Sequence, residues 1–200
     1  MIQFPEPDLE KFALLLHEIG AVRLGQFRLH SGRVSPIYLD LRMLVSHPEV
    51  LRLATAVYMT ILADLTYDRL AAAPMAGLPL GTALCLALDK PLIYPRKTAK
   101  SYGTGKGIEG AYQIGETAVI IDDLITSGDS VLQASAALKA GGLQVNDAVV
   151  LIDRQQGGMD ALRNAGYQPH AAMTIRQILS ILENHQRITA RDTARVLQSL

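Results

Sequence analysis

Two adjacent carboxylates, Asp122 and Asp123, follow the apolar residues 118–121, which are typical of a buried strand. In an open parallel sheet, ligands bind beyond the carboxyl ends of the strands. Neighbouring carboxylates repel each other unless each of them has a partner. Ribose hydroxyls can donate hydrogen bonds to carboxylates, and a divalent cation is the other partner that suits them. The pair therefore indicates a site for a sugar or a cation at the end of this strand.

The residues Thr-Ser-Gly-Asp-Ser at 126–130 add a second kind of chemistry, because they precede an expected helix at 130–140. Unpaired N–H groups and the dipole of a helix N-terminus attract anions. Gly128 lets the backbone approach a ligand closely, and the hydroxyl groups add donors. An Asp or Ser that merely caps the helix is the alternative. Beside the acid pair, the segment predicts a ribose-phosphate site, with Asp129 pointing away from the phosphate to cap the helix.

Residues 96–110 form a long stretch without apolar periodicity. The stretch contains one acid, Glu109, and four cations, Arg96, Lys97, Lys100 and Lys106. A loop of this length inside a compact domain is usually a functional lid or a disordered segment. Since charge-rich stretches are often only solvated surface, that interpretation stays as the alternative to a cationic lid.

The elements that must position these groups alternate between strands and helices. The expected strands are 69–73, 91–95, 117–122, 147–153 and 169–175. The expected helices are 8–20, 47–65, 79–88, 130–140, 157–166, 175–185 and 189–199. A hairpin-like pair of short strands is expected in 26–42, around Ser31 and Gly32. The alternation predicts an α/β fold with a mostly parallel sheet flanked by helices on both faces.

Composition limits the class of protein. The chain has 200 residues, 49% of them hydrophobic and 19% charged, which predicts one globular domain. The formal net charge of +0 gives no global electrostatic reason to expect nucleic acid or an anionic membrane as a partner. The single Cys85 excludes an intrachain disulfide and fits a reducing, cytoplasmic compartment, and no signal peptide is visible. The uncharged residues 70–88 are interrupted by Pro and Gly, which favours a buried strand, loop and helix over a membrane span.

The stretch at 119–130, VIIDDLITSGDS, resembles the phosphoribosyl-pyrophosphate (PRPP) motif of type I phosphoribosyltransferases. Three other stretches, at 31–42, 96–110 and 149–158, resemble orotate phosphoribosyltransferases, most closely the kind found in eukaryotic uridine monophosphate synthase. The resemblance runs from about residue 9 nearly to the C-terminus. It implies a single type I phosphoribosyltransferase domain over 1–200, with a flexible catalytic loop and a small hood subdomain. The hood would come from about residues 1–45 and the C-terminal helices.

The resemblance also implies an activity: the transfer of a phosphoribosyl group from PRPP to orotate, which gives orotidine 5′-monophosphate and pyrophosphate. Asp122 and Asp123 would hold the ribose hydroxyls, with Lys100 and Asp123 as the catalytic residues. The residues implied to bind PRPP are Met75, Ala76, Arg96, Lys97, Lys100, Tyr102, Asp122, Asp123, Leu124, Ile125, Thr126, Ser127, Gly128, Asp129 and Ser130. Those implied to bind orotate are His30, Ile37, Tyr38, Thr126 and Arg154.

Three positions depart from the pattern of the family. Tyr102 stands where many bacterial members have a histidine, Ala76 where some bacterial members have a lysine, and His30 where a lysine often precedes the Ser-Gly. The first predicts a contact without proton transfer, and the second removes one pyrophosphate contact. A strand histidine without a role is the alternative for His30. Core packing is the alternative for Ile37 and Tyr38, and a surface salt bridge is the alternative for Arg154.

Magnesium is the implied cofactor, held through substrate phosphates and water without a direct protein ligand. The implied assembly is a homodimer with shared active sites, and whether a decarboxylase is fused to the chain or partners it stays open. Three functional alternatives remain: a phosphoribosyltransferase for uracil or a purine, a PRPP-sensing regulator that binds RNA or DNA, and a structural dimer. The net charge and the cations of residues 96–100 argue against the regulator, and a structural dimer leaves the acid pair unexplained.

Overall fold

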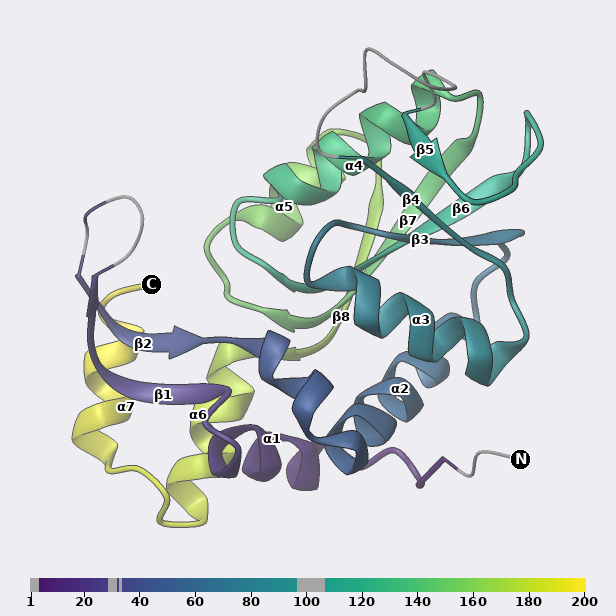
Figure 1. Ribbon diagram of the computed structural model, residues 1–200. Coiled ribbons are helices and arrows are strands. Elements are labelled where there is room, and N and C mark those ends of the chain that lie inside the picture. The colour runs from purple at the N-terminus through teal and green to yellow at the C-terminus, as the bar shows by residue number, and fades with distance from the viewer. Residues whose placement is uncertain (1–3, 29–31, 33, 97–106) are drawn as a thin grey trace.

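The computed structural model describes residues 4–28, 32, 34–96 and 107–200. Its centre is a six-stranded sheet in the order β5-β4-β3-β6-β7-β8, in which the short β5 is antiparallel to β4 and the other neighbours run parallel (Figure 1). The strands are β3 (Arg69–Ala72), β4 (Leu92–Pro95), β5 (Ile108–Glu109), β6 (Thr117–Ile125), β7 (Gln144–Asp153) and β8 (Gln168–Thr174). The sheet confirms the predicted α/β fold.

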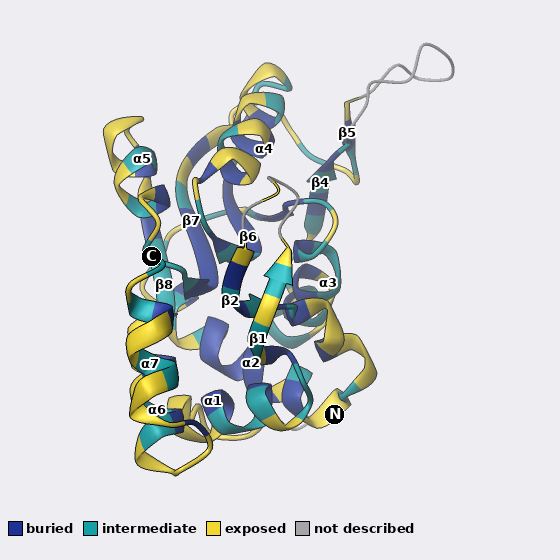
Figure 2. Cartoon of the chain, turned by 90° about the vertical axis from the view of Figure 1, so that its left-hand side faces the viewer, coloured by how far each residue is buried: buried dark blue, intermediate teal, exposed yellow. Residues whose placement is uncertain are grey.

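Helices cover both faces of this sheet (Figure 1). On one face lie α2 (Pro48–Leu62) and α3 (Gly77–Leu88), and on the other lie α4 (Asp129–Ala140) and α5 (Gly158–Asn164). Side chains of a strand alternate between the faces. Val119 and Ile121 of β6 therefore join the core under α2 and α3, while Ile120 joins the core under α4 and α5. Because both faces are covered, β6 and β7 are buried along most of their length (Figure 2).

The N-terminal and C-terminal segments lie together at one end of the molecule (Figure 1). A two-stranded antiparallel sheet of β1 (Val22–Arg28) and β2 (Val34–Leu39) packs with α7 (Ala190–Leu197). The helix α1 (Leu9–Glu18) packs against α6 (Ile175–Asn184), and the 3-10 helix η1 (Leu41–Ser46) leads into α2. These are the segments expected to form the hood, whose identity as a separate subdomain stays a prediction.

The predicted elements are found, with shifted ends. Strand β6 continues to Ile125, because Leu124 and Ile125 still pair with the end of β7. Strand β1 begins at Val22, since Val22 pairs with Leu39. The segment 96–110 contributes the short strand β5 at its end. Among the described residues, none of the helices combines the length and the apolar character that a membrane crossing needs.

Candidate active site

A pocket of about 160 Å³ opens at the carboxyl end of β6, between the loop after β3 and the loop before α4. Its lining consists of Pro74, Met75, Ala76 and the residues from Asp122 to Val131. The structure thus brings together the acid pair, the expected phosphate loop and the expected pyrophosphate loop. This is the edge of the sheet where parallel α/β proteins bind ligands.

The acid pair lies inside β6, and each carboxylate bonds to the backbone next to it. Asp122 is only 6% exposed, and its Oδ1 accepts the N–H of Asp123 at 3.0 Å. Oδ1 of Asp123 accepts the N–H of Leu124 at 2.8 Å. Burial, and then the charge of Asp123, raises the pKa of Asp122 to about 8. Burial also raises the pKa of Asp123, although the N–H of Leu124 acts against that shift. The unliganded pair therefore retains a proton near neutral pH.

That proton gives a testable pH dependence. Between the pKa of about 3.9 for an unfolded Asp and about 8 for folded Asp122, the folded chain holds a proton that the unfolded chain has released. The free energy of unfolding therefore falls as the pH rises through this window. In Asp122→Asn the group no longer titrates, so we expect the unliganded wild type to lose more stability than the variant between pH 5 and pH 8. Urea unfolding at several pH values measures this difference, and parallel profiles would contradict it.

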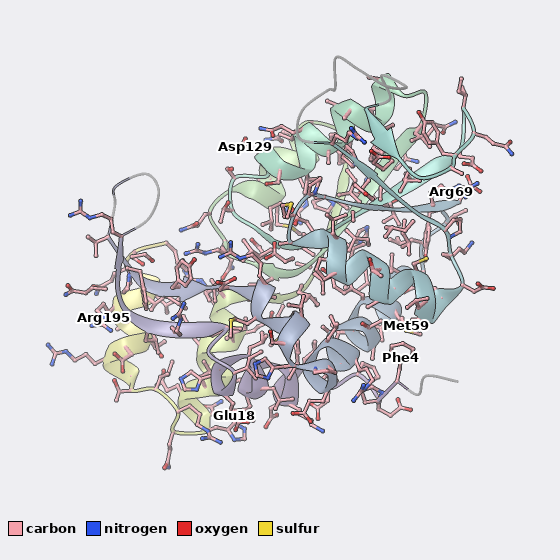
Figure 3. All side chains as sticks on the ribbon, viewed as in Figure 1. Phe4, Glu18, Met59, Arg69, Asp129 and Arg195 are labelled. Carbon is pink, nitrogen blue, oxygen red and sulfur yellow. The ribbon has the colours of Figure 1, made fainter. Side chains whose placement is uncertain are left out.

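The segment between β6 and α4 adopts a tight turn at Gly128, whose φ of +88° suits glycine. Gly128 is the N-cap of α4, and no capping bond from a side chain is found there in the described residues. The carboxylate of Asp129, at the start of α4 (Figure 3), instead accepts the hydroxyl of Ser127 at 2.7 Å. Asp129 thus does not cap the helix, because Gly128 takes the cap position, and its pointing away from the phosphate stays a prediction.

The loop between β7 and α5 packs against this turn. A Cβ added to Gly158, the first residue of α5, would lie 2.5 Å from the carbonyl oxygen of Thr126 and 2.6 Å from a side-chain carbon of Ile125. A Cβ on Gly128 would in turn meet the carbonyl oxygen of Gly158 at 3.2 Å. The two loops therefore pack backbone against backbone, which fixes the shape of the turn.

The expected pyrophosphate loop also rests on β6. The N–H of Ala73 donates to the carbonyl of Ile121 at 2.9 Å. A Cβ on Gly77 would lie 2.4 Å from the same oxygen, so only glycine fits there. Met75 is 66% exposed, and it lines the pocket together with Ala76. The loop thus presents its backbone beside the acid pair.

Arg154 follows β7 directly, and its N–H donates to the carbonyl of Ile125 at 3.0 Å. It therefore lies beside the end of β6. Burial lowers the pKa of the guanidinium, and its Nε has no hydrogen-bond partner in the described part of the chain. A partly buried cation without a counter-charge is costly unless a ligand supplies one.

The residues expected on the orotate side behave differently from one another. Ile37 is 1% exposed and its side chain belongs to the core, while its carbonyl accepts the hydroxyl of Ser35 at 2.7 Å. Tyr38 is half-buried, stacks with Phe27 at 5.4 Å between ring centroids and lies under the guanidinium of Arg23. His30 lies outside the described residues.

Two residues near the site were missed in the sequence. Arg42 donates to both carboxylate oxygens of Asp40, at 2.6 and 2.9 Å, and to the hydroxyl of Tyr38 at 3.3 Å. It is also near enough to Asp123 to oppose the rise in the pKa of that acid. Tyr58 of α2 donates to the main-chain carbonyl of Asp122 at 2.5 Å. The approach of Arg42 to Asp123 and the bond from Tyr58 to Asp122 could not be predicted from local patterns, because both join segments that are distant in sequence.

The described part of the cationic segment consists of Arg96 and residues 107–110. Lys97, Lys100 and Tyr102 lie outside the described residues. Arg96 is described: its guanidinium forms an ion pair with Glu109, and its N–H donates to the carbonyl of Gly107 at 2.9 Å. It also lines a second pocket of about 600 Å³, which shares Pro74 and Ser130 with the first. Of the segment's cations, Arg96 is thus seen beside the acid pair's pocket.

Comparison with known proteins agrees with this geometry. Residues 43–165 match the family model described as phosphoribosyl transferase domain. The chain is 43% identical to the bifunctional enzyme PyrF/PyrE of Nostoc sp. over 186 residues, which cover 93% of this chain and 38% of that protein. It is 40% identical to the orotate phosphoribosyltransferase of Pyrobaculum aerophilum over 171 residues, which cover 85% of this chain and 89% of that protein.

A solved structure is similar along nearly the whole chain. The uridine monophosphate (UMP) synthase of Leishmania donovani superposes with a TM-score of 0.88 and 38% identity, over 96% of this chain and 42% of that one. The chain thus spans about two fifths of the length of the bifunctional Nostoc protein and of this synthase. The matched family model, together with a relative of similar length at 40% identity, shows that the chain belongs to the orotate phosphoribosyltransferase family.

Proposed function

We propose that the protein is an orotate phosphoribosyltransferase of pyrimidine biosynthesis. It transfers the 5-phosphoribosyl group of PRPP to orotate, which yields orotidine 5′-monophosphate and pyrophosphate. The observation that carries the proposal is the acid pair beside a glycine turn at a helix N-terminus, in a chain of this family. Carboxylates for the ribose hydroxyls and backbone N–H groups for the 5′-phosphate match the two ends of one ribose phosphate.

The chemistry requires stabilisation of a departing pyrophosphate while the C1 carbon of ribose becomes cationic. Preorganised cations on the leaving group are the strongest single means of doing so. Lys97, Lys100 and Arg96 supply them in this proposal, with Lys100 as the main catalytic group. Arg96 is paired with Glu109, so pyrophosphate oxygens would take the place of that carboxylate. Asp123 and Asp122 hold the ribose in line for attack.

Orotate is an acid with a planar ring, and the proposal places it between the hairpin and the end of β7. Arg154 donates to an acceptor of orotate, which supplies the counter-charge that its half-buried guanidinium lacks among the described residues. Tyr38 and the backbone of Ile37 lie against the ring. Thr126 lines the pocket between the phosphate and the base.

Magnesium is part of the proposal. The oxygen atoms of the acid pair suit a hard cation, and Mg²⁺ is commonly held through substrate phosphates and water. Within the described residues, groups of three or more His, Cys, Asp or Glu side chains that could enclose a metal are not found. We propose that the ion arrives with PRPP, because Mg²⁺ keeps much of its water and binds substrate phosphates, with the acid pair acting through ribose hydroxyls or water.

The proposed assembly is a homodimer with shared sites. Helix α3 (Gly77–Leu88) supports it, since Leu86 in the last turn of this helix leaves a large apolar side chain 70% exposed. Exposed apolar side chains of this size are frequent at interfaces. The names of the Nostoc and Leishmania relatives support a decarboxylase as fusion or partner. A cytoplasmic location is part of the proposal, in keeping with the free thiol of Cys85.

An assay with purified protein, Mg²⁺, PRPP and orotate tests the proposal through the loss of orotate absorbance. We expect turnover with orotate that stops when a chelator removes Mg²⁺. Turnover with uracil or a purine but not with orotate would assign a different acceptor. Salt-dependent binding of RNA or DNA without turnover of any base would instead favour a PRPP-sensing regulator.

A further inference from the structure

Tyr58 reaches the acid pair from beneath the sheet. It lies in α2, is fully buried, and its hydroxyl donates to the main-chain carbonyl of Asp122 at 2.5 Å. Its ring belongs to the core cluster that also contains Val149 and Leu151 of β7. The pocket that holds the carboxylates is lined by other residues, so the hydroxyl acts on the backbone and not on a ligand.

The bonded carbonyl belongs to the peptide that joins the two acids. That peptide is planar, so its carbonyl and the N–H of Asp123 turn together. The N–H of Asp123 is the group that donates to the carboxylate of Asp122, at 3.0 Å. Tyr58 therefore binds the carbonyl of this peptide, and the N–H of the same peptide binds the carboxylate of Asp122.

The next peptide extends the arrangement. The N–H of Leu124 donates to the carboxylate of Asp123 at 2.8 Å. A rotation of the peptide between the acids would change ψ of Asp122 and φ of Asp123, the backbone angles next to the two side chains. The positions of both carboxylates are thus linked to the carbonyl that Tyr58 holds.

The hydroxyl of Tyr58 keeps its proton and so remains a hydrogen-bond donor. Burial raises the pKa of Tyr58 well above its ordinary value, and the charges of Asp123 and Asp122 act in the same direction. The group therefore stays protonated throughout the pH range in which the protein would work. Asp122 also pairs with Val150 in the β6–β7 ladder, so loss of the hydroxyl would remove one donor from this buried carbonyl and loosen the orientation of its peptide.

We propose that Tyr58 is a positioning residue that sets the orientation of Asp122 and Asp123 for PRPP through the peptide between them. The inference rests on the proposed function, because it takes the acid pair to be the ribose site. The inference predicts different effects on the two substrates. The affinity for PRPP depends on Tyr58, whereas orotate binds to other residues.

Calorimetric titration of the unmodified protein and of Tyr58→Phe with PRPP and Mg²⁺ tests the inference. Phenylalanine keeps the ring in the core and removes only the hydroxyl. We expect the affinity for PRPP to fall about fivefold or more, as for the loss of one hydrogen bond. We expect KM for orotate at saturating PRPP to stay within about twofold, because the orotate contacts are untouched.

Tyr167→Phe is the matched control. Tyr167 is also buried, and its hydroxyl accepts from Ser135 at 2.8 Å and from Lys139 at 3.0 Å. It lies just before β8, at the amino end of that strand, and does not line the pocket. We expect a comparable loss of melting temperature but unchanged PRPP affinity. Equal PRPP affinity in Tyr58→Phe and the unmodified protein would overturn the inference, as would equal losses in both variants. An unmodified protein that does not bind PRPP would instead overturn the proposed function.

A second variant, Tyr58→Met, guards against a folding defect in the first. Methionine fills the space of the ring flexibly and also lacks the hydroxyl. If Tyr58→Phe does not fold, Tyr58→Met carries the same comparison with Tyr167→Phe. The result expected is again a selective loss of PRPP affinity, and unchanged affinity would again overturn the inference.

Discussion

Replacement of Lys100 by alanine is expected to lower kcat/KM by roughly two to three orders of magnitude with little change in the melting temperature. The proposed reaction places several negative charges on a pyrophosphate that departs without covalent help from the protein. Each cation that is held against those oxygens lowers the barrier, and an alanine cannot replace it. Steady-state kinetics with orotate and PRPP, together with thermal unfolding, measure both parts of the prediction.

Lys11→Ala is the control for this variant. Lys11 is an exposed lysine on α1, at the end of the molecule away from the acid pair's pocket. Its removal changes the net charge by the same amount and should leave kcat/KM unaltered. If Lys100→Ala turned over like the wild type, Lys100 would have no part in the mechanism, and the other cations of the segment would have to be tested in its place.

Asp123→Asn is expected to weaken PRPP binding by roughly 30-fold, which corresponds to about 2 kcal/mol for a hydrogen bond to a charged group. An amide offers one acceptor oxygen in place of two, and its NH₂ group cannot accept from a ribose hydroxyl. The remaining oxygen is also needed by the N–H of Leu124. Calorimetry with PRPP and Mg²⁺ measures the loss, and equal affinity would remove the ribose assignment.

Asp160→Asn provides the comparison for the loss of one negative charge. The side chain of Asp160 is 79% exposed on α5, where it pairs with Arg163 at 2.8 Å. An exposed pair of this kind contributes little to stability. We expect its PRPP affinity to match that of the wild type, so that a loss in Asp123→Asn reports on the position of the carboxylate and not on net charge.

The strands and the position of the site were predictable because their signals are local. The unbroken apolar run at 149–152 predicts a strand covered on both faces, and helices do cover both faces there. The acid pair and Gly128 were placed at the end of β6 by sequence order alone. Once a parallel sheet is predicted, the carboxyl ends of its strands locate the candidate site.

Other features of the fold and of the site could not be predicted, because they depend on contacts between segments that are distant in sequence. Tyr58 appears in the sequence as one more apolar position of an amphipathic helix, yet its hydroxyl finds a partner 64 residues away. Asp129 does not cap α4 because Gly128, with its positive φ, takes the cap position. The end of β6 moved to Ile125 since its pairing depends on how far β7 extends. None of these facts follows from a propensity or a period.

The close approach of Gly158 to the carbonyl of Thr126 makes the shape of the β6–α4 loop depend on the shape of the β7–α5 loop. A methyl group introduced at Gly158 would be transmitted to a loop about thirty residues earlier, although the altered residue itself never meets a ligand. A redesign of the β6–α4 loop for another sugar must therefore change the β7–α5 loop as well. If the β7–α5 loop stayed unaltered, its contacts would favour the original conformation of the β6–α4 loop.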